Sequence, residues 1–380
     1  MHTKGYAAPE PKAAVEQARL LIERSETLGE PPEDPLLLFS VLNGFWVANI
    51  VAFNGDVARE LAAQFMALAE KQGATLPLMI GHRLMGTSLL LTGDIVEGRA
   101  HFDQGIALCD HTEDRPLATR FGQAIWVYIL SDQSLALWLL GYPEAAIAAT
   151  KRVLKDAREF GQVATLMYAL DQSSLTLILC GNDATATTQF EELVALTEEK
   201  GVLFWKGYAM AGQGCVLALT GNAPNAVHMI TSGITVFRST GATYRWPSDL
   251  AHLARAHAEL GQFDDAWRCV GEAMTAAETT KERWFEAEIQ RIAGEIALMS
   301  PEPDAAKAES YFERALAVAG KQQAKSWELR AAMSMARLLR DQGKRQEARD
   351  LLAPVYGWFT EGFDTLDLKD AKALLDSLAS

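Results

Sequence analysis

Glycines recur at an interval of about 40 residues along most of this chain of 380 residues. They are Gly55, Gly93, Gly141, Gly181, Gly221, Gly261 and Gly343. A Ser300-Pro301 turn replaces the glycine that is missing between the last two, and the longer gap before Gly141 predicts an insertion at Asp110–Arg115. A fixed period of this size is typical of a repeat solenoid, in which each unit packs only on its neighbours. The length therefore does not require two or three ordinary domains.

Small residues accompany these glycines at constant offsets. Seven residues before a turn glycine stand residues such as Gly86, Ser134 and Gly214, and five residues after it stand Gly98 and Ala146. Two helices approach closely only where neither has a bulky side chain. The glycine itself favours the left-handed conformation that ends a helix. Each period therefore predicts one hairpin of two helices.

The segments between the turns have apolar residues at helical spacing, as in Ala308, Phe312 and Ala315. No stretch alternates with period two for long enough to indicate a sheet. We therefore predict an all-α fold: a right-handed superhelical solenoid that forms one domain over residues 1–380. We place about eight helix pairs at 36–357, an N-terminal helix at 11–29 and a C-terminal capping helix at 366–379.

Composition limits the classes of partner. The chain is 49% hydrophobic and 22% charged, which is a globular composition, and its formal charge is −14. This charge disfavours binding to nucleic acid or to an anionic membrane. No apolar run is long enough for a membrane span, and the N-terminus does not resemble a secretory signal, so we expect a cytoplasmic protein. The four cysteines form no CxxC pair, and we expect them to be small core residues.

Two levels of family resemblance follow from local motifs. Gly261-Gln262-Phe263-Asp264-Asp265-Ala266 resembles the turn and second helix of a tetratricopeptide repeat. Longer motifs at 5–10, 137–143, 324–332 and 356–365 are similar to the C-terminal repeat domain of bacterial multidomain regulators, of the predicted ATPase and adenylate/guanylate cyclase type. The resemblance implies a regulatory role through binding of a partner or effector. The chain has no GxxxxGK[ST] phosphate loop, so no catalytic residue is carried over.

The resemblance also implies which residues face the groove. In tetratricopeptide arrays the first helix of each pair lines the concave surface, with positions 13, 10 and 6 before the turn glycine pointing inward. Tyr128, Tyr168 and Tyr208 share the first of these positions, and Trp126 and Trp246 lie close to it. The remaining groove candidates are Arg83, Asp132, Asp171, Arg255, Arg291 and Arg330. Another position in the repeat is shared by Trp205, Trp284 and Trp327. We expect these three to pack between helices.

Two interpretations of these residues stay open. In one, the tyrosines are packing residues with their hydroxyls at solvent, and the arginines pair with Glu288, Glu295 and their neighbours. In the other, they bind a small anionic or aromatic effector, or an acidic peptide or protein segment, because Tyr and Arg are frequent anchors of binding sites.

Catalytic and metal-binding patterns are absent from the sequence. We find no HExxH, no clustered Cys/His spacing, no GxSxG and no GxGxxG, so we expect no metal and no cofactor. The leading hypothesis is a regulatory binding module and not an enzyme. One alternative is an enzyme with a pocket on the inner helices, where Asp249 and His252 act as an acid–base pair. Another is a scaffold that works only by oligomerisation.

Overall fold

The computed structural model describes residues 20, 36–109 and 124–379. Within these ranges all regular elements are α-helices, which confirms the predicted all-α solenoid of tetratricopeptide type. The helices pair as α2 (Leu36–Val51) with α3 (Gly55–Gln72), α4 (Thr75–Thr92) with α5 (Ile95–Ala107), α7 (Ile125–Leu139) with α8 (Pro143–Phe160), α9 (Val163–Leu179) with α10 (Asp183–Lys200), α11 (Leu203–Leu219) with α12 (Ala223–Ser239), α13 (Trp246–Glu259) with α14 (Phe263–Thr280), α15 (Glu286–Met299) with α16 (Ala305–Gln322) and α17 (Lys325–Asp341) with α18 (Arg345–Tyr356). Helix α19 (Leu366–Ala379) follows the last pair. The helix expected at 11–29 and the insertion expected at 110–115 lie outside the described residues.

Small residues allow the two helices of a hairpin to pack closely, as the spacing predicts. A Cβ atom added to Gly98 in α5 would lie 2.8 Å from the carbonyl oxygen of Gly86 in α4 and 2.9 Å from the backbone nitrogen of Leu90. The turn glycine Gly93 has φ 100°, and its N–H donates to the carbonyls of Leu89 and Leu90 at the end of α4. The backbones are therefore in contact where both side chains are absent.

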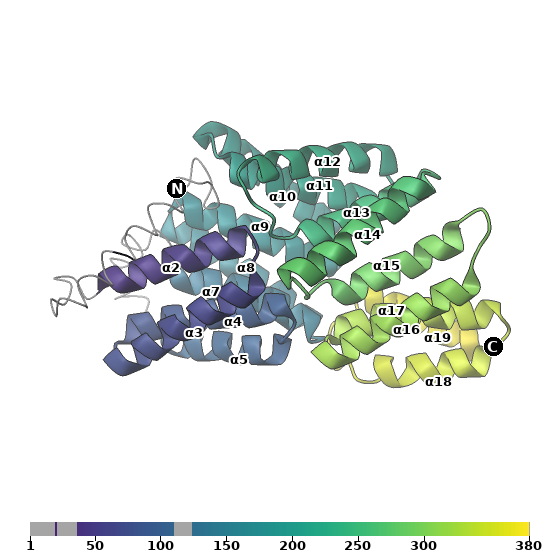
Figure 1. Cartoon of the computed structure of the whole chain (residues 1–380). Coiled ribbons are helices and arrows are strands. Elements are labelled where there is room, and N and C mark those ends of the chain that lie inside the picture. The colour runs from purple at the N-terminus through teal and green to yellow at the C-terminus, as the bar shows by residue number, and fades with distance from the viewer. Residues whose placement is uncertain (1–19, 21–35, 110–123, 380) are drawn as a thin grey trace.

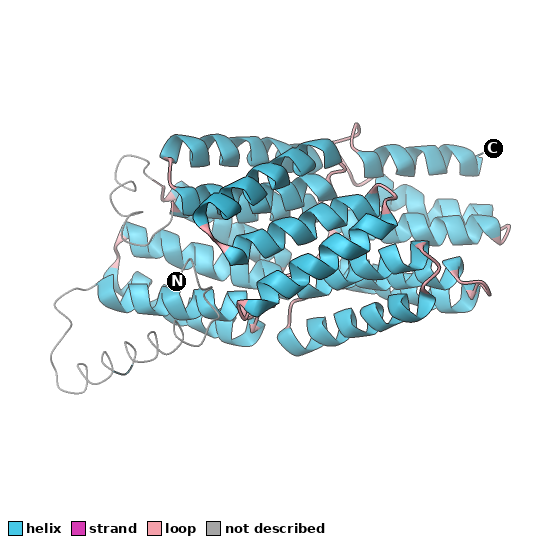
Figure 2. Cartoon of the chain, turned by 90° about the horizontal axis from the view of Figure 1, so that it is seen from above, coloured by secondary structure: helices cyan, strands magenta, loops and turns pink. Residues whose placement is uncertain are grey.

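The solenoid curves until distant hairpins meet. The carbonyl oxygen of Val51, at the end of α2, accepts a hydrogen bond of 2.9 Å from the backbone N–H of Thr243, just before α13. Leu91 in α4 accepts one of 2.9 Å from Arg283, just before α15. The side chains of Ser326 and Arg330 make further bonds between distant hairpins, to the carbonyl oxygens of Trp138 and Leu179. In Figure 1 the early hairpins, drawn in purple to blue, lie at the left and the last hairpins, drawn in yellow-green to yellow, lie at the right. Figure 2 shows only helices and loops in the described part of the chain. The ends of the early first helices thus pack on the beginnings of the late ones.

The remaining sequence expectations concern the core and the membrane. Cys180, Cys215 and Cys269 are buried free thiols, and Cys109 is half-buried. None of the helices in the described ranges combines the length and the apolar character that crossing a membrane would need.

Candidate functional site

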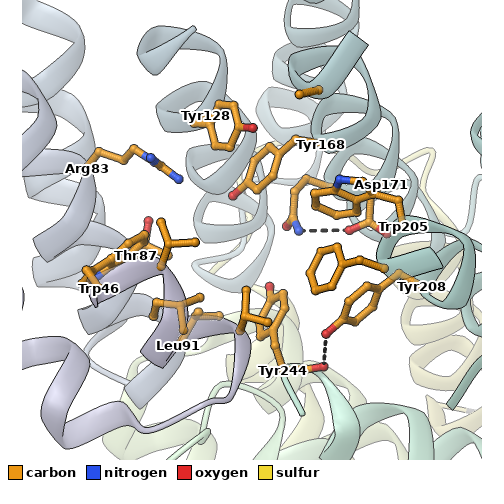
Figure 3. Close-up of a pocket in the computed structure, with 16 residues that line it drawn as sticks. Trp46, Arg83, Thr87, Leu91, Tyr128, Tyr168, Asp171, Trp205, Tyr208 and Tyr244 are labelled. Carbon is orange, nitrogen blue, oxygen red and sulfur yellow. Dashed lines mark hydrogen bonds between the residues drawn. The ribbon is translucent and has the colours of Figure 1, made fainter. Parts of the chain in front are cut away.

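A pocket lies on the inner side of the superhelix, with about 700 Å³ of empty space that includes its opening to solvent. Its lining comes from α2, α4, α7, α9 and α11, each the first helix of a hairpin, and from the segment that precedes α13. We call it the aromatic pocket, because its lining includes Trp46, Tyr128, Tyr168, Phe204, Trp205, Tyr208 and Tyr244. The other lining residues are Val47, Ile50, Val51, Arg83, Thr87, Leu91, Ala164, Asp171 and Gln172 (Figure 3).

The three periodic tyrosines all reach this pocket. The rings of Tyr128 and Tyr168 stack with centroids 3.8 Å apart, and Trp205 meets Tyr168 edge-on at 5.9 Å. Tyr208 lies farther along and is buried against Phe237 of α12, with centroids 4.7 Å apart. The tyrosines therefore share one pocket without forming a continuous stack.

Two of the tyrosine hydroxyls are bonded within the protein and do not point to solvent. Tyr168 donates to Oδ1 of Asp132 at 2.5 Å. Tyr208 donates to the carbonyl oxygen of Tyr244 at 2.9 Å, as Figure 3 shows. Burial raises the pKa of both phenols, so they remain donors at neutral pH. These bonds fix the rings at the pocket wall.

Arg83 lines one side of the aromatic pocket, and Asp132 lies behind the lining residues Thr87 and Tyr168. The Arg83 guanidinium lies 4.4 Å from the ring centroid of Tyr128 and 5.3 Å from that of Trp46. Asp132 is buried, and it accepts hydrogen bonds of 2.5 Å from Thr87 and from Tyr168. Burial raises the pKa of Asp132, and the nearby Arg83 charge opposes this shift.

A second buried ion pair joins Asp171 to Arg245. The guanidinium donates to both carboxylate oxygens, at 3.0 and 3.1 Å, and also lies 4.6 Å from the ring centroid of Tyr208. Arg245 has a left-handed backbone, with φ 63°, which is a strained conformation for a residue other than glycine. Burial raises the pKa of Asp171, and Arg245 opposes this shift.

The candidate acid–base pair lies in a separate cavity of about 380 Å³. Asp249, His252, Arg245 and Cys215 line it, and the Cys215 thiol contacts Oδ1 of Asp249 at 3.9 Å. Burial raises the pKa of Asp249 to about 7, against the effect of Arg245. Burial lowers the pKa of His252 to about 4, and Glu288 opposes that shift. The structure thus brings these two side chains to one cavity; their catalytic role stays a prediction.

The predicted arginines converge on a third pocket, of about 840 Å³, at the C-terminal part of the groove. Arg291 forms hydrogen bonds of 2.7 Å with Glu288 and an ion pair with Glu295, as the packing interpretation proposed. Arg330 pairs with Asp367 at 2.8 Å. Arg255 pairs with Glu259 at 3.1 Å. The lining has four arginines, Arg255, Arg291, Arg330 and Arg337, against five carboxylates, Asp183, Glu288, Glu295, Asp367 and Asp370. This balance does not favour an anion.

Two of the predicted groove residues lie elsewhere. Trp126 is buried in the core, edge-on to Phe160 with centroids 5.2 Å apart. Trp246 is half-buried, with the Arg238 guanidinium 4.1 Å from its ring. Neither lines any of the pockets described above. Each stands two residues before the position that the tyrosines occupy in the repeat. A shift of two residues along a helix points a side chain in a very different direction around the axis.

Four aromatic residues of the pocket were missed in the sequence: Trp46, Phe204, Trp205 and Tyr244. Trp205 was expected to pack because it shares its phase with Trp284 and Trp327, which are indeed buried. It differs from them by lining the pocket. Tyr244 lies between two hairpins, where the repeat period assigns no inward or outward direction.

Fold and pocket together define a helical-repeat solenoid with an aromatic pocket on its concave side. The family model for the tetratricopeptide repeat matches residues 250–270 and 329–354, which lie in the hairpins α13–α14 and α17–α18. A search of the curated proteins finds no match.

Solved structures share this architecture at low sequence identity. A Rap protein complexed with Competence and Sporulation Factor superposes with a TM-score of 0.64 at 10% identity, covering 96% of this chain and 95% of the other. The apo form of the quorum sensor NprR from B. thuringiensis gives 0.50 at 13% identity, with 90% and 95% covered. The Rap conjugation gene regulator of plasmid pLS20, in complex with the Phr* peptide, gives 0.50 at 11%, with 79% and 76% covered. At these identities the likeness shows the fold alone.

Proposed function

We propose that this chain is a regulatory binding module whose aromatic pocket receives a side chain of a short peptide or protein segment. The observation that supports this most directly is the pocket itself, on the concave side, whose lining comes from six parts of the superhelix and includes seven aromatic residues. Concave, mostly apolar pockets with a few polar groups are typical of ligand sites, and aromatic residues commonly dominate binding energy. The similarly folded pLS20 regulator is described in complex with a peptide, which agrees with this proposal.

The pocket is also suited to binding because its walls are fixed in place. The ring stack of Tyr128 on Tyr168, the bond from Tyr168 to Asp132 and the ion pair of Asp171 with Arg245 hold the lining side chains without a ligand. A site with ordered walls loses less conformational entropy when the ligand enters. We extend the proposal to the regulatory context of the multidomain regulators that the sequence resembles, in which such a module senses an effector.

Filling the pocket tests this proposal. Ala164 lines the pocket from α9, so Ala164→Phe places a ring in the space that a ligand would occupy. Peptides are first selected from a random display library for binding to the unmodified chain. They should bind the variant with a dissociation constant at least about ten-fold higher. Ala148→Phe is the matched control, because Ala148 is exposed on α8. Equal binding of the selected peptides to both variants would contradict the proposal.

A further inference from the structure

The charges around the aromatic pocket restrict the ligand that it can receive. An aromatic lining alone is ambiguous, because electron-rich ring faces bind cations in some proteins and stack with neutral rings in others. The choice depends on what already lies against those faces. In this pocket, guanidinium groups occupy positions next to the rings on two sides.

Arg83 stands on one side of the pocket. Its guanidinium is 4.4 Å from the Tyr128 centroid and 5.3 Å from the Trp46 centroid, within the range of a cation–π contact. The Tyr128 ring is also stacked with Tyr168, so it has no free face for a ligand cation. Figure 3 shows Arg83 pointing toward these tyrosines at the edge of the pocket.

Arg245 has the same relation to the opposite wall. Its guanidinium is 4.6 Å from the Tyr208 centroid and 5.8 Å from the Tyr244 centroid. Tyr208 is also stacked against Phe237 at 4.7 Å with an interplanar angle of 2°, so its two faces are taken by Arg245 and Phe237. What such a ring offers to the pocket is its edge, which is electropositive.

The two carboxylates nearby do not restore affinity for a cation. Asp171 gives both oxygens to Arg245 at 3.0 and 3.1 Å, and Asp132 is covered by hydrogen bonds from Thr87 and Tyr168. Of the two charged residues that line the pocket, Asp171 is thus engaged by Arg245, and Arg83 is the cation that an entering ligand meets.

We infer that the aromatic pocket selects a neutral or anionic aromatic group and rejects a cationic one; this rests on the proposed function. A ring entering the pocket meets tyrosine edges and the Arg83 guanidinium, both of which favour electron density on the ligand. For a peptide ligand, the anchor is a Phe, Tyr or Trp side chain that an acidic neighbour accompanies.

Three probes of nearly the same shape test the selection: phenylacetate, benzyl alcohol and benzylammonium. Ligand-observed NMR titrations at neutral pH give their dissociation constants for the unmodified chain. We expect the dissociation constants of phenylacetate and of benzyl alcohol to be lower than that of benzylammonium by a factor of about ten or more. All three should lose affinity in Ala164→Phe, which locates the binding. If benzylammonium binds tightest and is lost in Ala164→Phe, the selection is wrong although the pocket is a ligand site.

Arg83→Gln tests the cause of the selection. Removing this guanidinium should reduce the preference for phenylacetate over benzylammonium about ten-fold and leave benzyl alcohol nearly unchanged. Arg337→Gln, in the charged pocket, is the matched control and should alter none of the three. An equal change for all three probes in Arg83→Gln would overturn the electrostatic argument. If no probe binds the unmodified chain, the inferred ligand preference is also wrong. The binding of library-selected peptides to Ala164→Phe then still tests the proposed function separately.

Discussion

Asp249 is a buried carboxyl group whose Oδ2 atom has no hydrogen-bond partner among the described residues. An ionised carboxylate without partners is costly in such an environment, which is why burial raises its pKa to about 7. Arg245 is near enough to oppose this shift, but its Nη1 and Nη2 groups donate to Asp171 and not to Asp249. The fold therefore favours protonated Asp249, and the unfolded chain favours the ionised form above about pH 4.

The pH dependence of stability follows with a definite sign. Because the folded pKa of Asp249 is raised, its contribution to stability falls as pH rises from about 4 to about 7. His252 has the opposite sign over its own range, since its lowered pKa makes stability rise from about pH 4 to its ordinary value of 6.5. Asp249→Asn removes only the first contribution. The free energy of unfolding of the variant should therefore increase, relative to that of the unmodified chain, by about 1.4 kcal/mol for each pH unit between about pH 4 and about pH 7.

Chemical denaturation across this pH range measures the gain. Asp264→Asn, on the exposed first turn of α14, is the control and should show no such trend. A stability difference for Asp249→Asn that is the same at every pH would show that this carboxyl is not held protonated by the fold.

At the residue scale, the sequence predicts the parts of the site that follow the repeat. Tyr128, Tyr168 and Tyr208 reach one pocket because a common position in successive first helices gives a common direction. The period gives no such information for Arg245, which lies between hairpins. Its partner Asp171 is 74 residues away, so the ion pair depends on how the superhelix curves. This curvature depends on small rotations between successive repeats, and no local motif encodes them.

At the scale of elements, the hairpin contact is the feature that the sequence predicts best. Gly86 and Gly98 stand at the predicted offsets, and the structure leaves no room for a Cβ atom on Gly98 against the α4 backbone. Most boundaries of the first helices follow as well, since glycines with positive φ, such as Gly93, Gly141 and Gly181, end them. Gly55 is an exception, because it is the first residue of α3 and has no positive φ. These features are local, so a single period determines them.

Gly98→Ala tests that contact. The added methyl group would lie 2.8 Å from the Gly86 carbonyl oxygen, which is backbone and cannot move aside alone, so α4 and α5 must separate. We expect a loss of about 1–3 kcal/mol in the free energy of unfolding, measured by denaturant titration. Gly271→Ala in α14 is the matched control: nothing lies within 4 Å of its Cβ position, and helix propensity alone should stabilise it by about 1 kcal/mol. A loss in both variants, or in neither, would contradict the packing argument.

At the scale of the whole molecule, the aromatic pocket exists because the solenoid curves back on itself. Trp46 and Val51 come from α2, whereas Tyr244 comes from the segment before α13, and the backbone bonds of Thr243 and Tyr244 to Val51 hold these parts together. An open, uncurved array of the same hairpins would separate these residues. The proposed ligand site is therefore a property of the superhelix and not of any one repeat.

The central claim is that this pocket receives an aromatic group, and crystals of the chain soaked with 4-bromophenylacetate test it directly. Bromine gives an anomalous diffraction signal that locates the ligand without reference to the fold. The account predicts a peak inside the aromatic pocket, among Tyr168, Trp205 and Tyr244. A peak only among the arginines of the C-terminal pocket, or no peak at a concentration that saturates binding in solution, would contradict it.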